Sequence, residues 1–222
     1  MDDAQSKLDR IDSYIESLFG GHDATLDANL ADAKAAGLPP INVSPNQGRL
    51  LCLLAKMARA ERILEIGTLG GYSTTWLARA LPASGLLISL ELNPEHAAVA
   101  RRSLDRAALG ARVEVRVGPA AEALRAMRAG REAPFDFAFI DADKPSYVEY
   151  LELVLPLSRR GTVIVADNLV RDGAVMEATP ADDNAKGARA FNAAIAAHPQ
   201  LESIILPIMR HAIDGMSISI VK

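Results

Sequence analysis

Residues 64–82 read LEIGTLGGYSTTWLARALP, and this stretch decides the fold. An apolar run, Arg62–Ile66, leads into a glycine-rich turn, and a helical pattern over 73–81 follows the turn. Glycine lets the backbone bend sharply and lets a ligand approach it closely. A helix that begins there offers free N–H groups to polar or negative ligand atoms. The stretch therefore predicts a strand, a ligand-binding turn and a helix, in that order.

The spacing of these glycines argues against a dinucleotide. A G-x-G-x-x-G fingerprint that began at Gly67 would need glycine at the positions of Leu69 and Tyr72. The pattern Glu65-x-Gly67-x-x-x-Gly71 suits a nucleoside without a pyrophosphate. The alternative for the turn is a glycine requirement set by packing alone.

Strand-like runs alternate with helical patterns on both sides of this stretch. The expected strands are Arg62–Ile66, Leu86–Leu90, Val113–Val117, Phe135–Ile140 and Thr162–Ala166. The expected helices between them cover 73–81, 95–108, 119–129 and 146–158. This alternation predicts right-handed crossovers and a parallel sheet. Two further runs, Ser203–Ile208 and Met216–Val221, are too close in sequence for a crossover helix, so one of them is expected to be antiparallel.

Helical patterns also precede the first strand. They cover 4–19 and 24–36, and a third begins at Ser44-Pro45, a typical N-cap followed by proline. We expect one domain over residues 1–222, with an N-terminal helical segment, 1–60, and a core, 61–222. The helical segment either covers the ligand site or forms a dimer contact.

Composition and charge narrow the class of protein. Half of the 222 residues are apolar, 23% are charged and the formal net charge is −4, which argues against nucleic acid as the main partner. Cys52 is the single cysteine, so an intrachain disulfide is excluded. No stretch approaches the roughly 20 apolar residues that span a bilayer, and the N-terminus lacks the apolar core of a secretory signal. We expect a soluble cytoplasmic protein with no membrane partner.

Polar side chains follow several of the expected strands at their carboxyl ends, where ligands bind in an open parallel sheet. Glu91 ends the second strand, 24 residues after Gly67, and its carboxylate can accept hydrogen bonds from both hydroxyls of a ribose. The alternative for Glu91 is a solvated surface acid. Gly118-Pro119-Ala120 follows the third strand and opens the next helix.

The fourth and fifth strands end in acidic residues. Asp141 comes directly after Phe135–Ile140, and Asp167 and Asn168 come directly after Thr162–Ala166. If these strands are neighbours, two carboxylates and one amide oxygen converge. Such a hard oxygen site suits Mg²⁺, with Ca²⁺ or Mn²⁺ as alternatives. The alternative for a single Asp here is a helix N-cap.

These residues resemble a known family. Residues 43–221 are similar to the small cation-dependent, S-adenosylmethionine-dependent O-methyltransferases, which include the caffeoyl-CoA O-methyltransferases, their bacterial relatives and, more distantly, catechol O-methyltransferase. The motifs are the stretch 64–82, FDFAFIDADKPSY at 135–147 and GTVIVADNLVRDGAV at 161–175. The resemblance implies a Rossmann-like class I methyltransferase fold of the α/β class. It has a seven-stranded, mostly parallel sheet with one antiparallel strand, helices on both faces and extra N-terminal helices.

The resemblance also implies roles for single residues. Asp141, Asp167 and Asn168 match the metal ligands, and Lys144 matches the lysine often assigned as general base, so Asp141 and Lys144 are the expected catalytic residues. The positions that match cofactor contacts are Val43, Glu65, Gly67, Thr68, Ser73, Glu91, Ala120 and Asp143. Plant relatives often carry Asp in place of Glu91, and either side chain can hold a ribose diol. The alternative for Lys144 is a solvated lysine.

The implied reaction is methyl transfer from the sulfonium of S-adenosylmethionine to a hydroxyl of a catechol-like aromatic acceptor. A nicotinamide-dependent oxidoreductase and a non-catalytic nucleoside-binding protein on a similar fold are the alternatives. Relatives are commonly dimers, so we expect a homodimer.

The segments expected to face the acceptor, 20–46 and 171–184, match no motif. Arg171 and Asp172 are expected at the acceptor mouth, and His96 is expected to be solvated. His22 and His211 flank segments that could cover the active site, so a substrate contact stays open for both.

Overall fold

The computed structural model of the chain describes residues 2–19, 23–209 and 212–222. The helices are α1 (Asp2–Phe19), α2 (Ala24–Ala35), α3 (Pro45–Met57), α4 (Tyr72–Ala78), α5 (Pro94–Arg106), α6 (Ala120–Ala129), α7 (Tyr147–Val154) and α8 (Asp183–Ala197). The strands are β1 (Arg62–Ile66), β2 (Leu86–Glu91), β3 (Val113–Val117), β4 (Phe135–Ile140), β5 (Ser158–Ala166), β6 (Leu201–Met209) and β7 (Ile213–Val221). Short 3₁₀ turns are η1 (Gly110–Arg112), η2 (Lys144–Ser146), η3 (Leu155–Leu157) and η4 (Arg171–Met176).

The strands form one seven-stranded sheet in the described part of the chain, in the order β3-β2-β1-β4-β5-β7-β6. β1 to β5 pair in parallel, and β7 is antiparallel to both of its neighbours, β5 and β6. This confirms the mostly parallel sheet with one antiparallel strand. The strand order reverses between β1 and β4, which is where ligands bind in such sheets.

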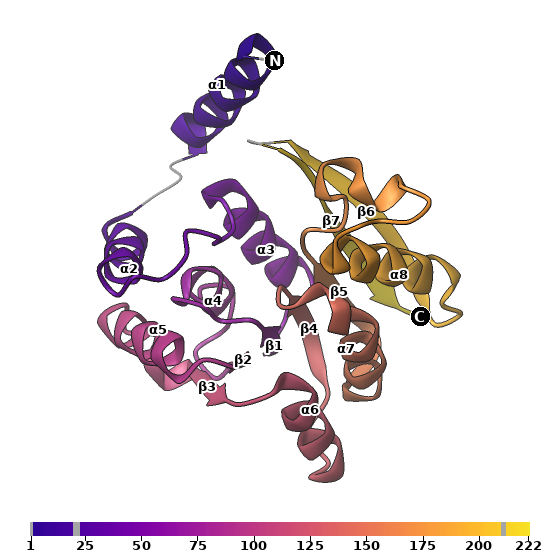
Figure 1. The fold of residues 1–222 in the computed structure, drawn as a ribbon. Coiled ribbons are helices and arrows are strands. Elements are labelled where there is room, and N and C mark those ends of the chain that lie inside the picture. The colour runs from indigo at the N-terminus through magenta and orange to yellow at the C-terminus, as the bar shows by residue number, and fades with distance from the viewer. Residues whose placement is uncertain (1, 20–22, 210–211) are drawn as a thin grey trace.

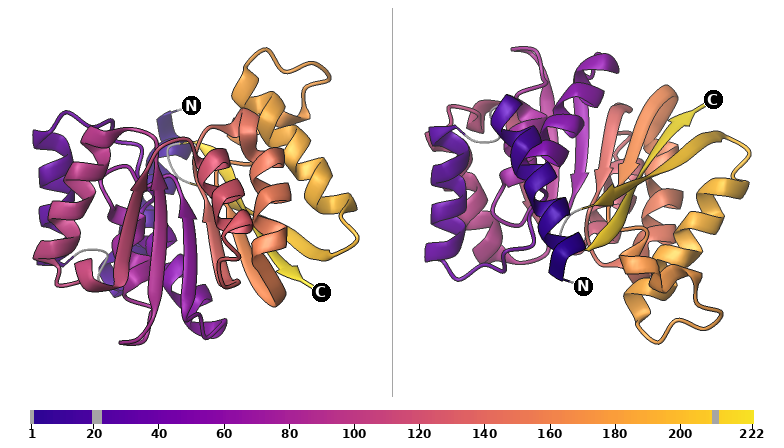
Figure 2. Two further views of the ribbon diagram at one scale, coloured as in Figure 1. Left: turned by 90° about the horizontal axis from the view of Figure 1, so that it is seen from below. Right: turned by 90° about the horizontal axis from the view of Figure 1, so that it is seen from above.

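Helices cover both faces of the sheet (Figures 1 and 2). α2, α3, α4 and α5 lie on one face, and α6, α7 and α8 lie on the other. The fully buried strand β4 contributes side chains to the apolar clusters on both faces of the sheet, because successive side chains of a strand point to opposite faces. Phe137 and Phe139 join the apolar cluster under α3 and α4, while Ala138 and Ile140 join the cluster under α7 and α8.

The N-terminal helices differ in how firmly they are held. The predicted cap of α3 is present: Ser44 and Gln47 form a reciprocal capping box, and Pro45 occupies the first turn. α2 is anchored to the glycine turn, since Asn29 Nδ2 donates to the carbonyl of Gly70 at 2.6 Å. α1 stands outside both helical layers (Figure 1). In the described residues no helix is both long and apolar enough to cross a membrane.

Helix α8 was not among the expected elements. Its inward face consists mostly of small residues, which give a weak apolar pattern. The small residues have a packing reason: a Cβ added at Gly187 would lie 2.3 Å from the carbonyl oxygen of Lys144 and 2.6 Å from the nitrogen of Pro145. Gly187 therefore lets α8 sit directly on the turn η2.

We predict that Gly187→Ala destabilises the fold, by about 1–3 kcal/mol or more, because the added methyl group overlaps backbone atoms. Helix propensity alone predicts the opposite effect, an increase of about 1 kcal/mol in the free energy of unfolding. The urea midpoint of unfolding decides between them. Ala190→Gly, at an exposed position of the same helix, is the control and should cost about 1 kcal/mol. An increased midpoint for Gly187→Ala would show that the contact with η2 is not tight.

Candidate active site at the carboxyl ends of the strands

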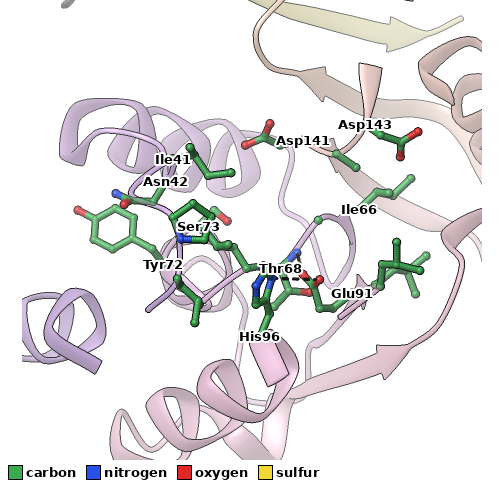
Figure 3. Close-up of a pocket in the computed structure, with 18 of the residues that line it drawn as sticks. Ile41, Asn42, Ile66, Thr68, Tyr72, Ser73, Glu91, His96, Asp141 and Asp143 are labelled. Atoms are coloured by element: carbon green, nitrogen blue, oxygen red, sulfur yellow. Dashed lines mark hydrogen bonds and ion pairs between the residues drawn. The ribbon is translucent and has the colours of Figure 1, made fainter. Parts of the chain in front are cut away.

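A cavity of about 1350 Å³ lies at the carboxyl ends of β1, β2 and β4. Figure 3 shows Asp141 and Asp143 on one side of it and Glu91 with His96 on the other. Ten of the predicted site residues line it: Val43, Gly67, Thr68, Ser73, Glu91, Ala120, Asp141, Asp143, Lys144 and Asn168. Glu65 and Asp167 are buried close by, at 0% and 2% exposure.

The glycine turn and the acidic end of β4 are in direct contact. Gly67 has φ +98°, and a Cβ added there would lie 2.0 Å from the carbonyl oxygen of Asp141. The amide of Asp141 in turn donates to the carbonyl of Ile66 at 2.9 Å. A residue with a side chain would push the two motifs apart, so the packing here requires glycine.

Glu91 holds the glycine turn in shape. Its Oε2 accepts from the amides of Thr68 (3.1 Å) and Leu69 (2.7 Å), and its Oε1 accepts from the amide of Asn93 (2.9 Å). His96 Nδ1 lies 3.6 Å from Oε1. His96 lines the cavity with its side chain 24% exposed, so the expectation that it is solvated was wrong. The first turn of α5 folds back over the end of β2 and brings His96 to Glu91.

Glu65 is fully buried and accepts hydrogen bonds from three hydroxyl groups. Ser73 Oγ and Ser89 Oγ donate at 2.6 Å, and Thr74 Oγ1 donates at 2.5 Å. Burial raises the pKa of Glu65 to about 7, although the three hydroxyl groups oppose this shift. Glu65 thus links the middle of the sheet to the first turn of α4.

The acidic residues after β4 and β5 are close enough to repel each other. Burial, together with the charge of Asp141, raises the pKa of Asp167 to about 7. Gln47 Nε2 lies 3.2 and 3.4 Å from the two carboxylate oxygens of Asp167, and the amide of Asn168 donates to Oδ1 at 2.8 Å. A divalent cation would relieve the repulsion between the two carboxylates.

Asn168 is oriented by Asp214, at the start of β7. Asn168 Nδ2 donates to Asp214 Oδ2 at 3.3 Å, so the amide oxygen faces away from Asp214. Asp214 Oδ1 also accepts from the amides of Val170 (3.0 Å) and Arg171 (3.1 Å). Asn168 and Arg171 have φ of +61° and +51°, a left-handed backbone that is costly without such support.

The donor set fits a hard divalent cation. It offers two carboxylates and one amide oxygen, the ligand types that Mg²⁺ and Ca²⁺ prefer. Within the described residues no group of three or more His, Cys, Asp and Glu side chains could hold a metal ion. The candidate set of Asp141, Asp167 and Asn168 therefore depends on its amide oxygen.

Lys144 is buried, with 6% exposure, and is not solvated. Its Nζ donates to Asp141 Oδ1 and the carbonyl of Ala142, both at 3.0 Å, and to Tyr147 Oη at 2.6 Å. These contacts use all three protons of an ammonium group. Lys144 must give up a proton and one of these bonds before it can accept a proton from another molecule.

Two tyrosines complete the site. Tyr147 Oη lies 3.1 Å from the carbonyl of Ile140 and 3.2 Å from that of Asp167, so it joins the ends of β4 and β5. Tyr150 Oη donates to Asp143 at 2.6 Å. Burial and the hydrogen bond with Asp143 raise the pKa of Tyr150 well above its ordinary value.

Sequence reasoning missed Gln47, Tyr147 and Asp214. The S-P-N-Q capping pattern was a signal for Gln47, but nothing local links Asp214 to residues more than forty positions earlier. Of the residues expected near the acceptor, Arg171 lines the cavity, and the carboxylate of Asp172 accepts from the amide of Ile213 at 3.4 Å. His22 and His211 lie outside the described residues.

Comparisons with known proteins identify the family of the chain. The chain matches the family model described as O-methyltransferase over residues 23–220. The chain belongs to the O-methyltransferase family. Membership of this family favours a methyltransferase over the two alternatives left open by the sequence, a nicotinamide-dependent oxidoreductase and a non-catalytic nucleoside-binding protein.

Two bacterial relatives and one solved structure are similar to this O-methyltransferase over nearly their full length. It is 47% identical over 216 residues to a catechol O-methyltransferase of Niastella koreensis, covering 97% of this chain and 98% of the relative. It is 44% identical to a catechol O-methyltransferase of Mycobacterium tuberculosis, covering 99% of both chains. The structure of an O-methyltransferase from Bacillus cereus in complex with SAH superimposes with a TM-score of 0.95 at 43% identity, covering 98% of this chain and 99% of that one.

We predict that Glu65 makes the ligand-free protein less stable as the pH rises from about 4.5 to about 7. The pKa of Glu65 is raised from 4.5 to about 7, so the folded state binds its proton more tightly than the unfolded state. The stabilisation is complete below the unfolded pKa and is lost as the pH passes the folded pKa, a change of roughly 3 kcal/mol at most.

Urea unfolding at several pH values between 4.5 and 8 measures this dependence. Glu65→Gln keeps the shape of the side chain and should flatten the dependence, leaving the part that Asp167 contributes. Glu152→Gln, on the exposed side of α7, should leave it unchanged. Equal slopes for the wild type and Glu65→Gln would show that Glu65 does not titrate in this range.

Proposed function

We propose that this enzyme transfers a methyl group from S-adenosylmethionine to a hydroxyl of a catechol-like aromatic, with the help of a divalent cation. The observation that carries the proposal is the position of Asp141 and Asn168 in the wall of one cavity beside the glycine turn, with Asp167 buried close behind them. The names of the relatives support it, because two similar proteins are catechol O-methyltransferases and a similar structure holds SAH.

The glycine turn and its surroundings form the proposed cofactor half of the cavity. Glu91 is fixed by backbone amides at the edge of this half, where its carboxylate can accept hydrogen bonds from a ribose diol. Val43, Thr68, Ser73, Ala120 and Asp143 line the same space, and Glu65 orients Ser73 from below. S-adenosylmethionine supplies the methyl group on a sulfonium, so its transfer needs no reduction or oxidation.

Asp141, Asp167 and Asn168 form the proposed metal half. A divalent cation held there, with Mg²⁺ as the first choice and Ca²⁺ or Mn²⁺ as alternatives, would stabilise negative charge on an acceptor hydroxyl. Asp214 and Gln47 keep two of the ligands in place. Placing the acceptor oxygen and the methyl donor in one cavity supplies the proximity on which in-line transfer depends.

Lys144 is the proposed general base. It lies beside Asp141 in the cavity wall, where its Nζ can reach an acceptor hydroxyl held near Asp141. Its hydrogen bond to Asp141 has to break first, and Tyr147 and Ala142 then keep the side chain in position.

We also propose a homodimer. α1 and α3 leave large apolar side chains exposed, Tyr14 and Leu18 on the first and Leu53 and Met57 on the second. Exposed apolar patches on packed proteins often mark contacts with other chains. Sedimentation velocity measures the oligomeric state.

A cytoplasmic location is also part of the proposal, and the free thiol of Cys52 is compatible with it.

We predict that Asp141→Asn abolishes metal-dependent turnover and leaves S-adenosylmethionine binding nearly unchanged. The substitution removes one charge from the proposed metal site without changing the shape of the side chain. Release of S-adenosylhomocysteine, with caffeic acid as acceptor and Mg²⁺ present, should fall by about 100-fold or more. Calorimetric titration with S-adenosylmethionine should give an affinity within about threefold of the wild type.

The wild type assayed with excess chelator is the matched test of the metal, and its turnover should disappear. Glu152→Gln is the control for loss of one negative charge. Equal turnover with Mg²⁺ and with chelator would rule out the metal site. A parallel loss of turnover and cofactor binding in Asp141→Asn would indicate misfolding or a wrong assignment.

We predict that Lys144→Met lowers kcat by about 10²-fold or more and changes the acceptor KM much less, because a general base acts in the transition state. The rate should regain part of its value as the pH rises and the acceptor ionises without help. Unchanged kcat would remove Lys144 from the mechanism. Cofactor titration of the same variant shows whether the buried site has kept its shape.

A further inference from the structure

Arg171 lies in the wall of the cavity on the side of the proposed metal ligands. It follows Asn168 by three residues, which span at most about 10 Å of chain. An acceptor held near Asn168 is therefore within reach of its long side chain.

The backbone of Arg171 is fixed. Its amide donates to Asp214 Oδ1 at 3.1 Å, and its φ of +51° is a left-handed conformation that the same contact supports. The side chain thus leaves the wall from a fixed point, which suits recognition of one defined group.

The ion pair of Arg171 is easy to exchange. Its Nη2 lies 3.5 Å from Asp182 Oδ2, and the two side chains are 29% and 53% exposed. Pairs this open contribute little to stability. Asp182 has a second role that does not need Arg171, because its Oδ2 accepts from the amide of Ala185 and caps α8.

The other cationic side chains of the described cavity wall are differently placed. Lys144 is buried and already makes three hydrogen bonds. Lys34 belongs to the last turn of α2, the helix that is anchored to the glycine turn. His96 faces Glu91. Arg171 is thus the partly exposed cation on the side of the proposed metal ligands.

We infer that Arg171 binds an anionic group of the acceptor, and that the preferred acceptors are catechols that carry a carboxylate away from their two hydroxyls. This rests on the proposed function. A guanidinium group and a carboxylate form two parallel hydrogen bonds, which select both charge and direction. In the absence of an acceptor the guanidinium of Arg171 pairs with Asp182, and the carboxylate of the acceptor takes the place of Asp182.

The test compares three acceptors: catechol, 3,4-dihydroxybenzoate and caffeate. For the wild type, kcat/KM for the better carboxylate should exceed that for catechol by about tenfold or more. Arg171→Gln should reduce this ratio to about twofold or less, mainly through KM. Asp182→Asn should raise the ratio by about two- to fivefold, since asparagine still caps α8 but no longer competes for Arg171.

Arg189→Gln is the matched control, because it removes an exposed guanidinium from α8 that binds the carbonyls of Glu177 and Ala178. Its ratio should equal that of the wild type. If catechol is methylated but the wild type shows no preference, or Arg171→Gln keeps the preference, this inference is wrong and the proposed function stands. If none of the acceptors is methylated, both are wrong.

Discussion

The close approach of Gly67 to the carbonyl of Asp141 is the constraint on which the rest of the site depends. It occurs where the strand order reverses, between β1 and β4, so the turn after β1 and the acids after β4 share one cavity. Any side chain at position 67 would separate the proposed cofactor half from the proposed metal half. One absent Cβ therefore sets how closely the turn after β1 approaches the acids after β4.

Around this contact the protein concentrates buried negative charge. Burial raises the pKa values of Glu65 and Asp167 to about 7, and the charge of Asp141 adds to both shifts. Such a cluster costs stability in the ligand-free protein. A cation between Asp141 and Asp167 would offset that cost, so the same repulsion that destabilises the fold favours metal binding. The ammonium group of Lys144 offsets part of it in the ligand-free state.

The sequence predicted the parts of the site that follow directly from strand ends. Glu91, Asp141 and Asp167 each come after an apolar run, and parallel strands bring such positions together. Helix α8 escaped prediction because Ala185, Gly187 and Ala188 form most of its inward face, so the apolar pattern is weak. His96 was misplaced because its neighbour in the chain, Glu95, does not reveal its neighbour in space, Glu91.

The antiparallel strand explains how a residue near the end of the chain reaches the site. β7 is antiparallel to β5, so β7 begins at the same end of the sheet at which β5 finishes. Asp214, the second residue of that strand, therefore lies next to the residues that follow β5. Its carboxylate accepts hydrogen bonds from Asn168, Val170 and Arg171. A parallel strand would have placed its first residues at the opposite edge. The reversal of one strand thus supports both a proposed metal ligand and the residue that would select the acceptor.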